Sequence, residues 1–418
     1  MRKDFFSKEL PRRRFVQMAA ASLPLVVGGF GACQAKGNGE KKIKVAVVMT
    51  TFFYRSHAHV ILENFLQPYL FNGKVVDPRE EFEIASFYVD QLAEEEGLDG
   101  ESSDMSQEVA KEFGIPVFEN IAGALGLGGE GLAVDAVLII GEHGKYPFNG
   151  RGQELYPKKR FFDETVAVFK KSGRVVPVYS DKHLSHLWDE AKAMYDTSRS
   201  MGFGLMAGSS VPLAERRPVM KIPSGAKVVE AVSIHGGPVE RYDFHGFEVL
   251  QSLLEGRAGN ESGVSEVQFL QGDALWKAAD EGRWSADLAA AAMRAEFPDD
   301  KRSLKEMWLD KFADADFYAV LVNYKDGTRG TVLKVGNDGI RWNFACQLEG
   351  ESKPLSTRFH VGPWNNRNLF RALSHSIQEH FRQGRSPYPV ERTLLTTGLL
   401  EAEMESRDKG GVAVKTPQ

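Results

Sequence analysis

The sequence predicts an α/β protein of two domains, in which a doubly wound parallel sheet is followed by an α+β domain with a mostly antiparallel sheet. In the N-terminal half, short apolar, β-branched segments alternate with segments of helical periodicity, as in βαβ units. From Lys227 onward, apolar segments are instead joined by short turns that contain Asp-Gly, which are typical of hairpins. Because successive βαβ units build a parallel sheet with helices on both faces, we expect the first domain to be Rossmann-like.

The first domain is expected to begin with Ile43–Met49, an almost continuous apolar segment of the kind found in strands buried on both faces. Further strands are expected at Phe82–Val89, 115–118, 133–140 and 175–179. Apolar residues at helical spacing predict helices at 60–66, Ser106–Phe113, 161–169 and 184–201. In such a sheet the carboxyl ends of all the parallel strands meet at one edge, where ligands bind.

The second domain is expected to contain two hairpins in its later part. Lys325-Asp326-Gly327 lies between apolar segments 317–324 and 331–335, and Asn337-Asp338-Gly339 lies between Val335 and Ile340. Helices are expected at 245–254, 368–381 and 392–406. We therefore divide the chain into four parts: an N-terminal export signal with a possible lipoprotein site and a linker (1–40), a parallel-sheet domain (41–206), an α+β domain (207–406) and a polar, frayed tail (407–418).

The composition excludes several classes of protein. The 418 residues carry a formal net charge of −5, mixed along the chain, and no basic stripe indicates nucleic-acid binding. Cys33 and Cys346 are the only cysteines, so the sequence has neither a disulfide framework nor a CxxC metal motif. Apolar, aromatic and charged fractions are those of an ordinary globular protein.

The first residues have the pattern of an export signal. Arg12-Arg13-Arg14 precedes a short apolar segment at 18–30, which predicts twin-arginine (Tat) export to the periplasm; a plain basic-flanked signal is the alternative. The segment closes with Gly31-Ala32-Cys33, which is similar to a bacterial lipoprotein cleavage site. If Cys33 is lipidated, the mature protein is tethered to a membrane by lipid alone.

Ionisable side chains follow the strands of the first domain at the points where each strand ends. The candidates are His57 and His59 after the first strand, Asp90 after the second, Glu142 and His143 after the fourth, and Lys182 after the fifth. His245 and Glu248 of the second domain are three residues apart and share a helix face. The alternatives are exposed or core histidines and a solvated Lys182 beside a helix cap. A charged residue at an apolar strand end is costly unless it is used or solvated, which favours a function for Glu142.

The first strand–helix turn lacks the feature that a dinucleotide needs. Residues 49–56 contain no glycine, although close approach of the backbone to a pyrophosphate requires glycine there. Arg55 could still contact a phosphate, and Asp90 lies where a ribose-binding carboxylate is expected. Asp90 therefore supplies one half of a dinucleotide fingerprint, and the glycines that form the other half are missing from the turn.

From about Lys44 to Ser406 the chain resembles the Gfo/Idh/MocA oxidoreductase family. Asp181-Lys182-His183 is similar to the family's Glu-Lys-Pro motif, residues 242–248 (YDFHGFE) to the segment with the catalytic histidine, and residues 384–390 to the family's closing stretch. A Tat-exported bacterial subgroup is the nearest match, by Gly-Glu-His-Gly at 141–144, Asp-Lys-His-Leu-Ser at 181–185 and Met-Ala-Gly-Ser-Ser at 206–210. The family's aspartate four residues before its histidine would fall on Arg241, so a proton-relay partner is missing or shifted.

The resemblance implies an oxidoreductase that acts on a sugar or polyol with bound NAD or NADP. Its implied catalytic residues are Lys182, which assists the substrate hydroxyl, His245 as general acid or base, and Glu248. The residues expected near the cofactor are Thr50, Thr51, Arg55, Asp90, Glu142 and Lys182.

Two other functions stay open. The first is a sugar lyase, isomerase or hydrolase that uses Zn²⁺ or Mn²⁺ held by a subset of His57, His59, Glu142, His143 and His245. The second is a glycan-binding protein without activity. By resemblance, an open face of the second sheet is also expected to pair with a second copy in a homo-oligomer.

Overall fold

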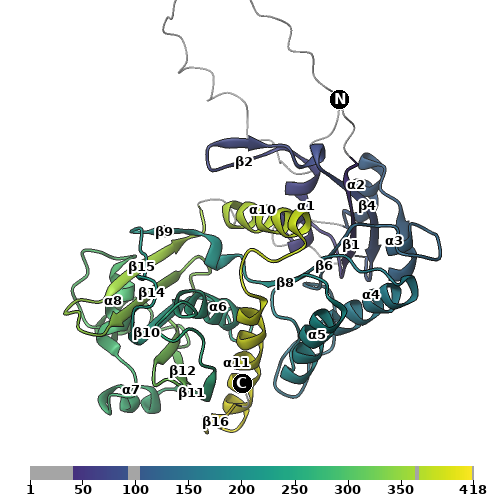
Figure 1. Ribbon diagram of the computed structural model, residues 1–418. Helices are drawn as coiled ribbons and strands as arrows, with labels where there is room; N and C mark the ends of the chain where they lie inside the picture. Colours follow the sequence, from purple (N-terminus) through teal and green to yellow (C-terminus); the bar gives the residue numbers. More distant parts are fainter. Residues whose placement is uncertain (1–40, 93–103, 363–366, 417–418) are drawn as a thin grey trace, which may run out of the picture.

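The structure, a computed structural model, describes residues 41–92, 104–362 and 367–416. Two sheets form the centres of two domains, with helices α10 (Arg367–Gln383) and α11 (Val390–Asp408) between them (Figure 1). The predicted fold class is confirmed: one sheet is parallel and covered by helices on both faces, and the other is mostly antiparallel. Within the described ranges, no helix is both long enough and apolar enough to cross a bilayer. The export signal and Cys33 lie outside the described residues.

The parallel sheet has the strand order β5-β4-β1-β6-β7-β8, so the chain reverses direction across the sheet between β1 and β6. Every neighbouring pair in it is parallel. A ligand crevice is expected where the order reverses, beyond the carboxyl ends of the strands. The strands are β1 (Ile43–Met49), β4 (Phe82–Val89), β5 (Val117–Phe118), β6 (Ala136–Ile140), β7 (Val178–Asp181) and β8 (Leu205–Gly208).

Successive residues of β1 pack into different cores, because side chains alternate across a strand. Val45, Val47 and Met49 face α1 (His57–Leu66) and α10. Ala46 and Val48 face the helices on the opposite side. Those helices are α3 (Ile121–Gly126), α4 (Lys158–Ser172) and α5 (Trp188–Met201). Helix α2 (Ser106–Phe113) lies on the same face of the sheet as α1. A small hairpin of β2 (Tyr69–Phe71) and β3 (Lys74–Val76) follows α1 in the chain.

The second sheet has the order β16-β11-β12-β13-β10-β14-β15-β9. Its neighbours are antiparallel except for β10 and β13, which run parallel. The strands are β9 (Glu215–Arg217), β10 (Val228–His235), β11 (Val264–Gln271), β12 (Tyr318–Tyr324), β13 (Arg329–Lys334), β14 (Trp342–Leu348), β15 (Leu355–His360) and β16 (Val414–Lys415).

Helices cover both faces of the middle of this sheet. Helix α6 (Asp243–Leu254) and α11 pack on one face. On the other, α7 (Asp273–Asp280), α8 (Ala286–Arg294) and α9 (Leu304–Lys311) build a separate core with Val232 and Leu321. The homo-oligomer through this sheet, expected by resemblance, stays a prediction.

Three local expectations were wrong. Asn337-Asp338-Gly339 does not close a hairpin, because β10 lies between β13 and β14 in the sheet. The parallel sheet does not end at residue 206, since β8 is its sixth strand among the described residues and reaches Gly208. The expected frayed tail instead continues α11 to Asp408 and then supplies β16, which pairs with β11. The hairpin at Asp326-Gly327 is confirmed by the pairing of β12 with β13.

Candidate active site

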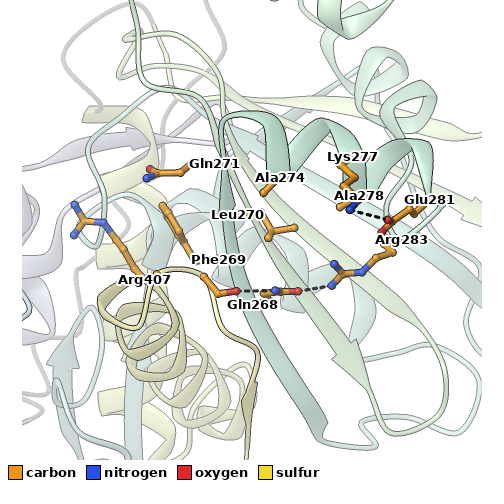
Figure 2. A pocket seen from close by; sticks show the side chains of 12 residues that line it. Gln268, Phe269, Leu270, Gln271, Ala274, Lys277, Ala278, Glu281, Arg283 and Arg407 are labelled. Carbon is orange, nitrogen blue, oxygen red and sulfur yellow. Dashed lines mark hydrogen bonds and ion pairs between the residues drawn. The ribbon is translucent and has the colours of Figure 1, made fainter.

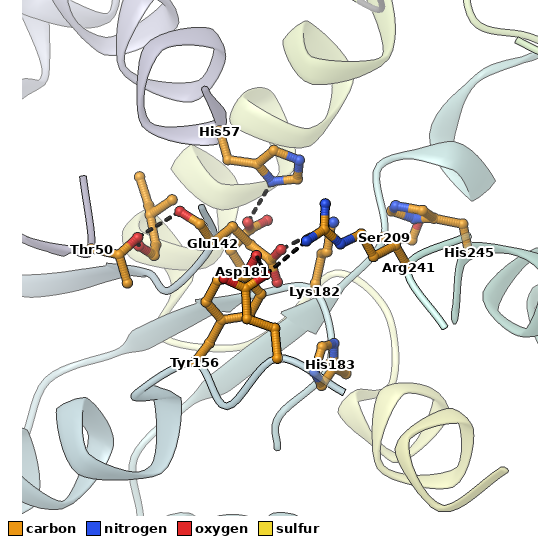
Figure 3. Close-up of polar contacts among 12 residues, drawn as sticks. Thr50, His57, Glu142, Tyr156, Asp181, Lys182, His183, Ser209, Arg241 and His245 are labelled. Carbon is orange, nitrogen blue, oxygen red and sulfur yellow. Dashed lines mark hydrogen bonds and ion pairs between the residues drawn. The ribbon is translucent and has the colours of Figure 1, made fainter. Parts of the chain in front are cut away.

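A cavity of about 600 Å³ lies where the carboxyl edge of the parallel sheet meets the second domain. Figure 3 shows that the polar side chains around it come from both domains. Cations and imidazoles that line the cavity are Arg55, His57, His143, Lys182, Arg241 and His245. Aromatic side chains that line it are Tyr54, Tyr242, Trp342 and Phe370.

A buried carboxylate between two lysines forms the base of the site. Oε1 of Glu142 lies 2.5 Å from Nζ of Lys158, and Oε2 lies 3.1 Å from Nζ of Lys182. Burial disfavours the charged form of Glu142, but Lys158 and Lys182 hold its pKa well below the usual value. Burial likewise acts against a charged Lys182, yet Glu142 and Asp181 raise its pKa above the usual value. Lys182 is therefore an ammonium at neutral pH.

His57 is held against the end of β7 by Asp181. Its Nδ1 lies 2.5 Å from Oδ2 of Asp181, whose other oxygen accepts a 3.2 Å hydrogen bond from the hydroxyl of Tyr179. Since a carboxylate only accepts, Nδ1 of His57 donates. His57 is the first residue of α1, which begins after Ser56; the Ser56 hydroxyl oxygen accepts from the backbone N–H of His59.

His245 lies at the start of α6 and bonds to the loop after β8. Its Nδ1 is 2.6 Å from Oγ of Ser209, and Oγ also accepts from the backbone N–H of Val211. Burial and then the charge of Lys182 lower the pKa of His245 well below its usual value. His245 is therefore neutral at physiological pH and able to accept a proton.

Backbone strain is concentrated around the cavity. Of the seven described non-glycine residues with positive φ, four lie at the site: Arg55 (71°), His143 (67°), Lys182 (60°) and Glu240 (70°). For residues with a Cβ this conformation costs on the order of 1–3 kcal/mol and persists only where the surroundings impose it. At Lys182 the surroundings include a bridge to β8, where the N–H of Gly208 donates to the Lys182 carbonyl.

Several predicted residues lie away from the cavity. His59 is fully buried, with its ring 4.9 Å from that of Tyr54. Glu248 is fully buried and accepts hydrogen bonds from the Ser209 N–H and from the hydroxyls of Thr393 and Thr396, so it links β8, α6 and α11. Thr50 donates to the carbonyl of Glu142, at 2.5 Å, and Thr51 is buried in the same turn.

The metal alternative is not supported by the geometry of the predicted ligands. Among the described residues, no three His, Cys, Asp or Glu side chains are grouped so that they could hold a metal ion. His57 and Glu142 are each held by another side chain, and His59 lies inside the first domain.

The residues on the adenosine side of the crevice do not fit a dinucleotide. Asp90 accepts hydrogen bonds from the hydroxyls of Tyr88 (2.5 Å) and Tyr146 (2.8 Å) and from Arg160 (2.5 Å), so both of its oxygens already have partners within the chain. Gln91, the next residue, forms two hydrogen bonds with the backbone of Lys145. The loop after β6 thus bridges to the end of β4, across the place where an adenosine would lie. Together with the absence of glycine at 49–56, these contacts depart from the dinucleotide-binding pattern on the adenosine side of the crevice.

Sequence reasoning missed several of the site's residues. The burial of Lys158 could have been predicted from the sequence. It lies three residues before Phe161 and four before Phe162, so it falls on the buried face of α4. Asp181 and Ser209 lie in motifs that the sequence analysis used for the resemblance, but no role was predicted for either side chain. Arg241 forms a 2.7 Å ion pair with Glu154, a contact across 87 positions that no local pattern predicts.

A second hollow, of about 340 Å³, lies between α7, β11 and the end of α11 (Figure 2). Its polar side chains mostly bond to each other, as in the pairs Gln268 with Arg283 and Lys277 with Glu281. No histidine lines it, in contrast to the cavity between the domains.

No protein-family model matches this chain, and no curated protein matches its sequence. Solved structures do match it. They include GenD2 from gentamicin A biosynthesis, in complex with NAD, with a TM-score of 0.54 and 12% identity over 93% of this chain and 100% of that one. A probable dehydrogenase from Thermotoga maritima matches with a TM-score of 0.53 and 11% identity, over 89% and 98% of the two chains. Myo-inositol 2-dehydrogenase from Lactobacillus plantarum matches with a TM-score of 0.51 and 10% identity, over 90% and 100%.

The chain has the fold of the Gfo/Idh/MocA-type dehydrogenases. This confirms the resemblance at the level of fold, over nearly the whole length of these relatives. Relative to the pattern expected for Gfo/Idh/MocA proteins, Lys182 and His245 stand in one cavity as predicted, and the dinucleotide residues depart from it. The Tat-exported subgroup remains a prediction from the motifs at 141–144, 181–185 and 206–210 and from the export signal.

Proposed function

We propose that this chain is an enzyme that acts on a carbohydrate or polyol at a carbon bearing a hydroxyl or carbonyl group. The observation that carries the proposal is that a protonated Lys182 and a neutral His245 line the same cavity. Nζ of Lys182 lies 3.1 Å from Glu142, which keeps it charged. An ammonium and a neutral imidazole are the two groups needed to take a proton from a hydroxyl and hold the resulting charge.

The cavity has the properties of a carbohydrate site. Its volume of about 600 Å³ is within the range of roughly 300–1,000 Å³ typical of small-molecule sites. Tyr242 and Trp342 stack with ring centroids 5.2 Å apart and planes at 10°, and both line the cavity. Aromatic faces bind the apolar faces of sugars, while the lysine, arginine and imidazole side chains supply hydrogen bonds to hydroxyl groups.

The proposed proton transfer assigns one role to each residue. Lys182 keeps its proton and donates a hydrogen bond to the substrate oxygen, which stabilises the negative charge as that oxygen loses its hydrogen. His245 accepts the hydroxyl proton, and Ser209 fixes the ring through Nδ1. Glu142 holds Lys182 in place from behind, and Glu248 holds the loop of Ser209.

Oxidoreduction is the reaction class that the fold relatives favour, since they are described as dehydrogenases and one is in complex with NAD. NAD or NADP would be the source or acceptor of hydride in that version of the proposal. The occupied Asp90 and the bridge from Gln91 to Lys145 favour a second version without a dinucleotide. In it, His245 takes a proton from the carbon next to a carbonyl group while Lys182 stabilises the enolate oxygen. An isomerase then returns the proton to the neighbouring carbon, and a lyase expels the β-hydroxyl group as water.

Two measurements test the proposal and choose between its versions. Mass spectrometry of the denatured protein, purified without added cofactor, detects retained nicotinamide. A panel of sugars and polyols is then followed by absorbance at 340 nm with NAD or NADP, and by NMR in D₂O for exchange of carbon-bound hydrogen. Cofactor-dependent turnover supports the first version; exchange or elimination without cofactor supports the second.

The substitution that tests the site is Lys182→Met, with Lys192→Met as its control. Lys192 is a surface lysine of α5 that is paired with Asp196. We expect Lys182→Met to lower turnover by about 10²–10³-fold, the loss typical of a charge-stabilising donor, and Lys192→Met to change it little. Near-normal turnover of the Lys182 variant would remove this residue from the mechanism.

We also propose that the protein is exported by the Tat pathway to the periplasm and that lipid on Cys33 tethers it to a membrane. Residues 12–14 and 31–33 support this proposal. Incorporation of labelled palmitate into the wild type, but not into Cys33→Ser, is the expected result. Equal labelling of both proteins, or of neither, would contradict the tether.

A further inference from the structure

The lining of the cavity has an unusual distribution of charge. Arg55, Lys182 and Arg241 line it, and no aspartate or glutamate is among the described residues that do. A neutral sugar needs both hydrogen-bond donors and acceptors from its site, because each hydroxyl is both. A wall of cations without carboxylates offers mainly donors, which suits an anion better.

Three nearby carboxylates, those of Glu142, Asp181 and Glu154, do not line the cavity and already have partners; Glu240 is also buried nearby, where burial and then the charge of Glu142 raise its pKa to about 7. Glu142 accepts from Lys158 and Lys182, and Asp181 accepts from His57. Glu154 accepts from the Tyr156 hydroxyl and from one terminal nitrogen of Arg241, at 2.7 Å each. These contacts hold the cations in position without placing negative charge on the cavity surface.

Arg241 is the cation best placed to bind a ligand. Its side chain is 51% exposed, and only one of its nitrogens is bound to Glu154. A guanidinium carries five N–H donors in a planar fork, so most of its donors remain available for a carboxylate or phosphate. In Figure 3, Arg241 lies beside Lys182 and between His57 and His245.

His143 supplies an independent observation at the same place. It lines the cavity, and its Nε2 is buried with no hydrogen-bond partner among the described residues. Burial and the charges of His57, Lys182 and Arg241 all lower the pKa of His143, which places these groups close around it. In the tautomer that carries its proton on Nε2, His143 would have a buried donor beside Lys182 and Arg241, and an anionic oxygen would complete that environment.

We propose that the substrate is an anionic carbohydrate, whose carboxylate or phosphate is bound by Arg241 beside His143 while its ring packs on Tyr242 and Trp342. This inference rests on the proposed function and specifies its substrate class. Lys182 and His245 then face a hydroxyl-bearing carbon of the same sugar. Arg55, which also lines the cavity, adds long-range attraction for the negative charge.

The test compares matched sugars by isothermal titration of the full chain in 50 mM salt. The probes are D-glucose, D-glucuronate, D-glucose 6-phosphate and inorganic sulfate. We expect glucuronate or glucose 6-phosphate to bind at least about tenfold more tightly than glucose, as a charge-assisted hydrogen bond provides. The tighter of the two identifies the anion as carboxylate or phosphate. Sulfate that binds as tightly as the sugar anions would overturn the proposal, because the site would then be selective for charge alone.

Arg241→Gln is compared with Arg199→Gln as a matched control. Arg199 also forms a 2.7 Å ion pair, with Glu391, and its side chain is 54% exposed, but it lies on α5 outside this cavity. We expect the preference for the anionic sugar to disappear in Arg241→Gln and to persist in Arg199→Gln. A preference that survives in Arg241→Gln would overturn the inference.

The outcomes separate this inference from the function on which it rests. Glucose that binds as tightly as the anions, with turnover lost in Lys182→Met, would overturn the anionic substrate and leave the enzyme. A chain that binds none of these sugars would overturn both.

Discussion

Lys158→Met tests whether the buried ion pair at the base of the site holds the first domain together. The substitution removes the ammonium 2.5 Å from Glu142 and keeps the length of the side chain. Glu142 is then a buried carboxylate with Lys182 as its one remaining cation, and the carbonyls of Asp181 and His183 lose a donor. Removing one partner of a buried pair costs about 3–5 kcal/mol, against a total stability of roughly 5–15 kcal/mol.

The neighbouring residue provides the control. Lys159 pairs with Asp163, also at 2.5 Å, but its side chain is 29% exposed and that of Asp163 is 55% exposed. An exposed pair four residues apart contributes about 0.3–0.5 kcal/mol, so Lys159→Met should be nearly neutral.

The assay is urea unfolding at pH 7.5, followed by circular dichroism and tryptophan fluorescence. We expect the double variant Glu142→Gln with Lys158→Met to recover part of the loss, because no charge is left buried without its partner. A loss below about 1 kcal/mol in Lys158→Met, or one equal to that of Lys159→Met, would refute the reasoning.

Three further predictions follow from other contacts. Burial and neighbouring charges lower the pKa of His143 to about 3, so below pH ~6.5 its imidazole binds a proton in the unfolded chain but not in the folded chain. The free energy of unfolding should therefore fall by up to about 2 kcal/mol from pH 6.5 to 5. Urea unfolding at each pH measures this fall, which should be smaller in His143→Gln. Glu248→Ala should lower stability by about 2–4 kcal/mol in thermal unfolding, because the Ser209 N–H and two threonine hydroxyls lose their acceptor. Turnover per folded molecule should also fall, since Ser209 positions His245; unchanged stability and turnover would refute this role. Gly237→Ala should displace Tyr242, since a Cβ there would lie 2.0 Å from its ring, and should weaken sugar binding measured by fluorescence titration; unchanged affinity would exclude Tyr242 from the binding surface.

Local patterns predicted the elements well where the deciding interactions are local. The bounds of β1, β4 and α2 are those that the sequence indicated. An apolar strand or an amphipathic helix can be recognised from the pattern of about ten neighbouring residues. The turn at Asn337-Asp338-Gly339 failed because β10, a segment about 100 residues earlier in the chain, inserts between the two strands that the turn joins. The residues of the turn contain no information about β10, so the turn alone could not predict that these two strands are not neighbours.

The site shows the same division. The end of each parallel strand is predictable, and Lys182, Glu142, His57 and His143 therefore gather as expected. What the sequence could not supply is the partner of each side chain. Asp90 was expected to bind a ribose, yet Arg160 and Tyr146, from a helix and a loop far along the chain, already bind it.

The position of α10 has a consequence for how the chain is made. This helix comes from the last sixth of the sequence, yet it packs against α1 of the first domain: Ser374 and Gln378 donate to the carbonyls of Ile61 and Asn64, and Phe381 packs on Phe65. Translation proceeds from the N-terminus, so the surface of α1 that packs against α10 stays exposed to water until residue 383 has left the ribosome. A nascent chain stalled after residue 362 should therefore be cleaved rapidly by protease within α1, whereas the released full-length chain should resist cleavage there.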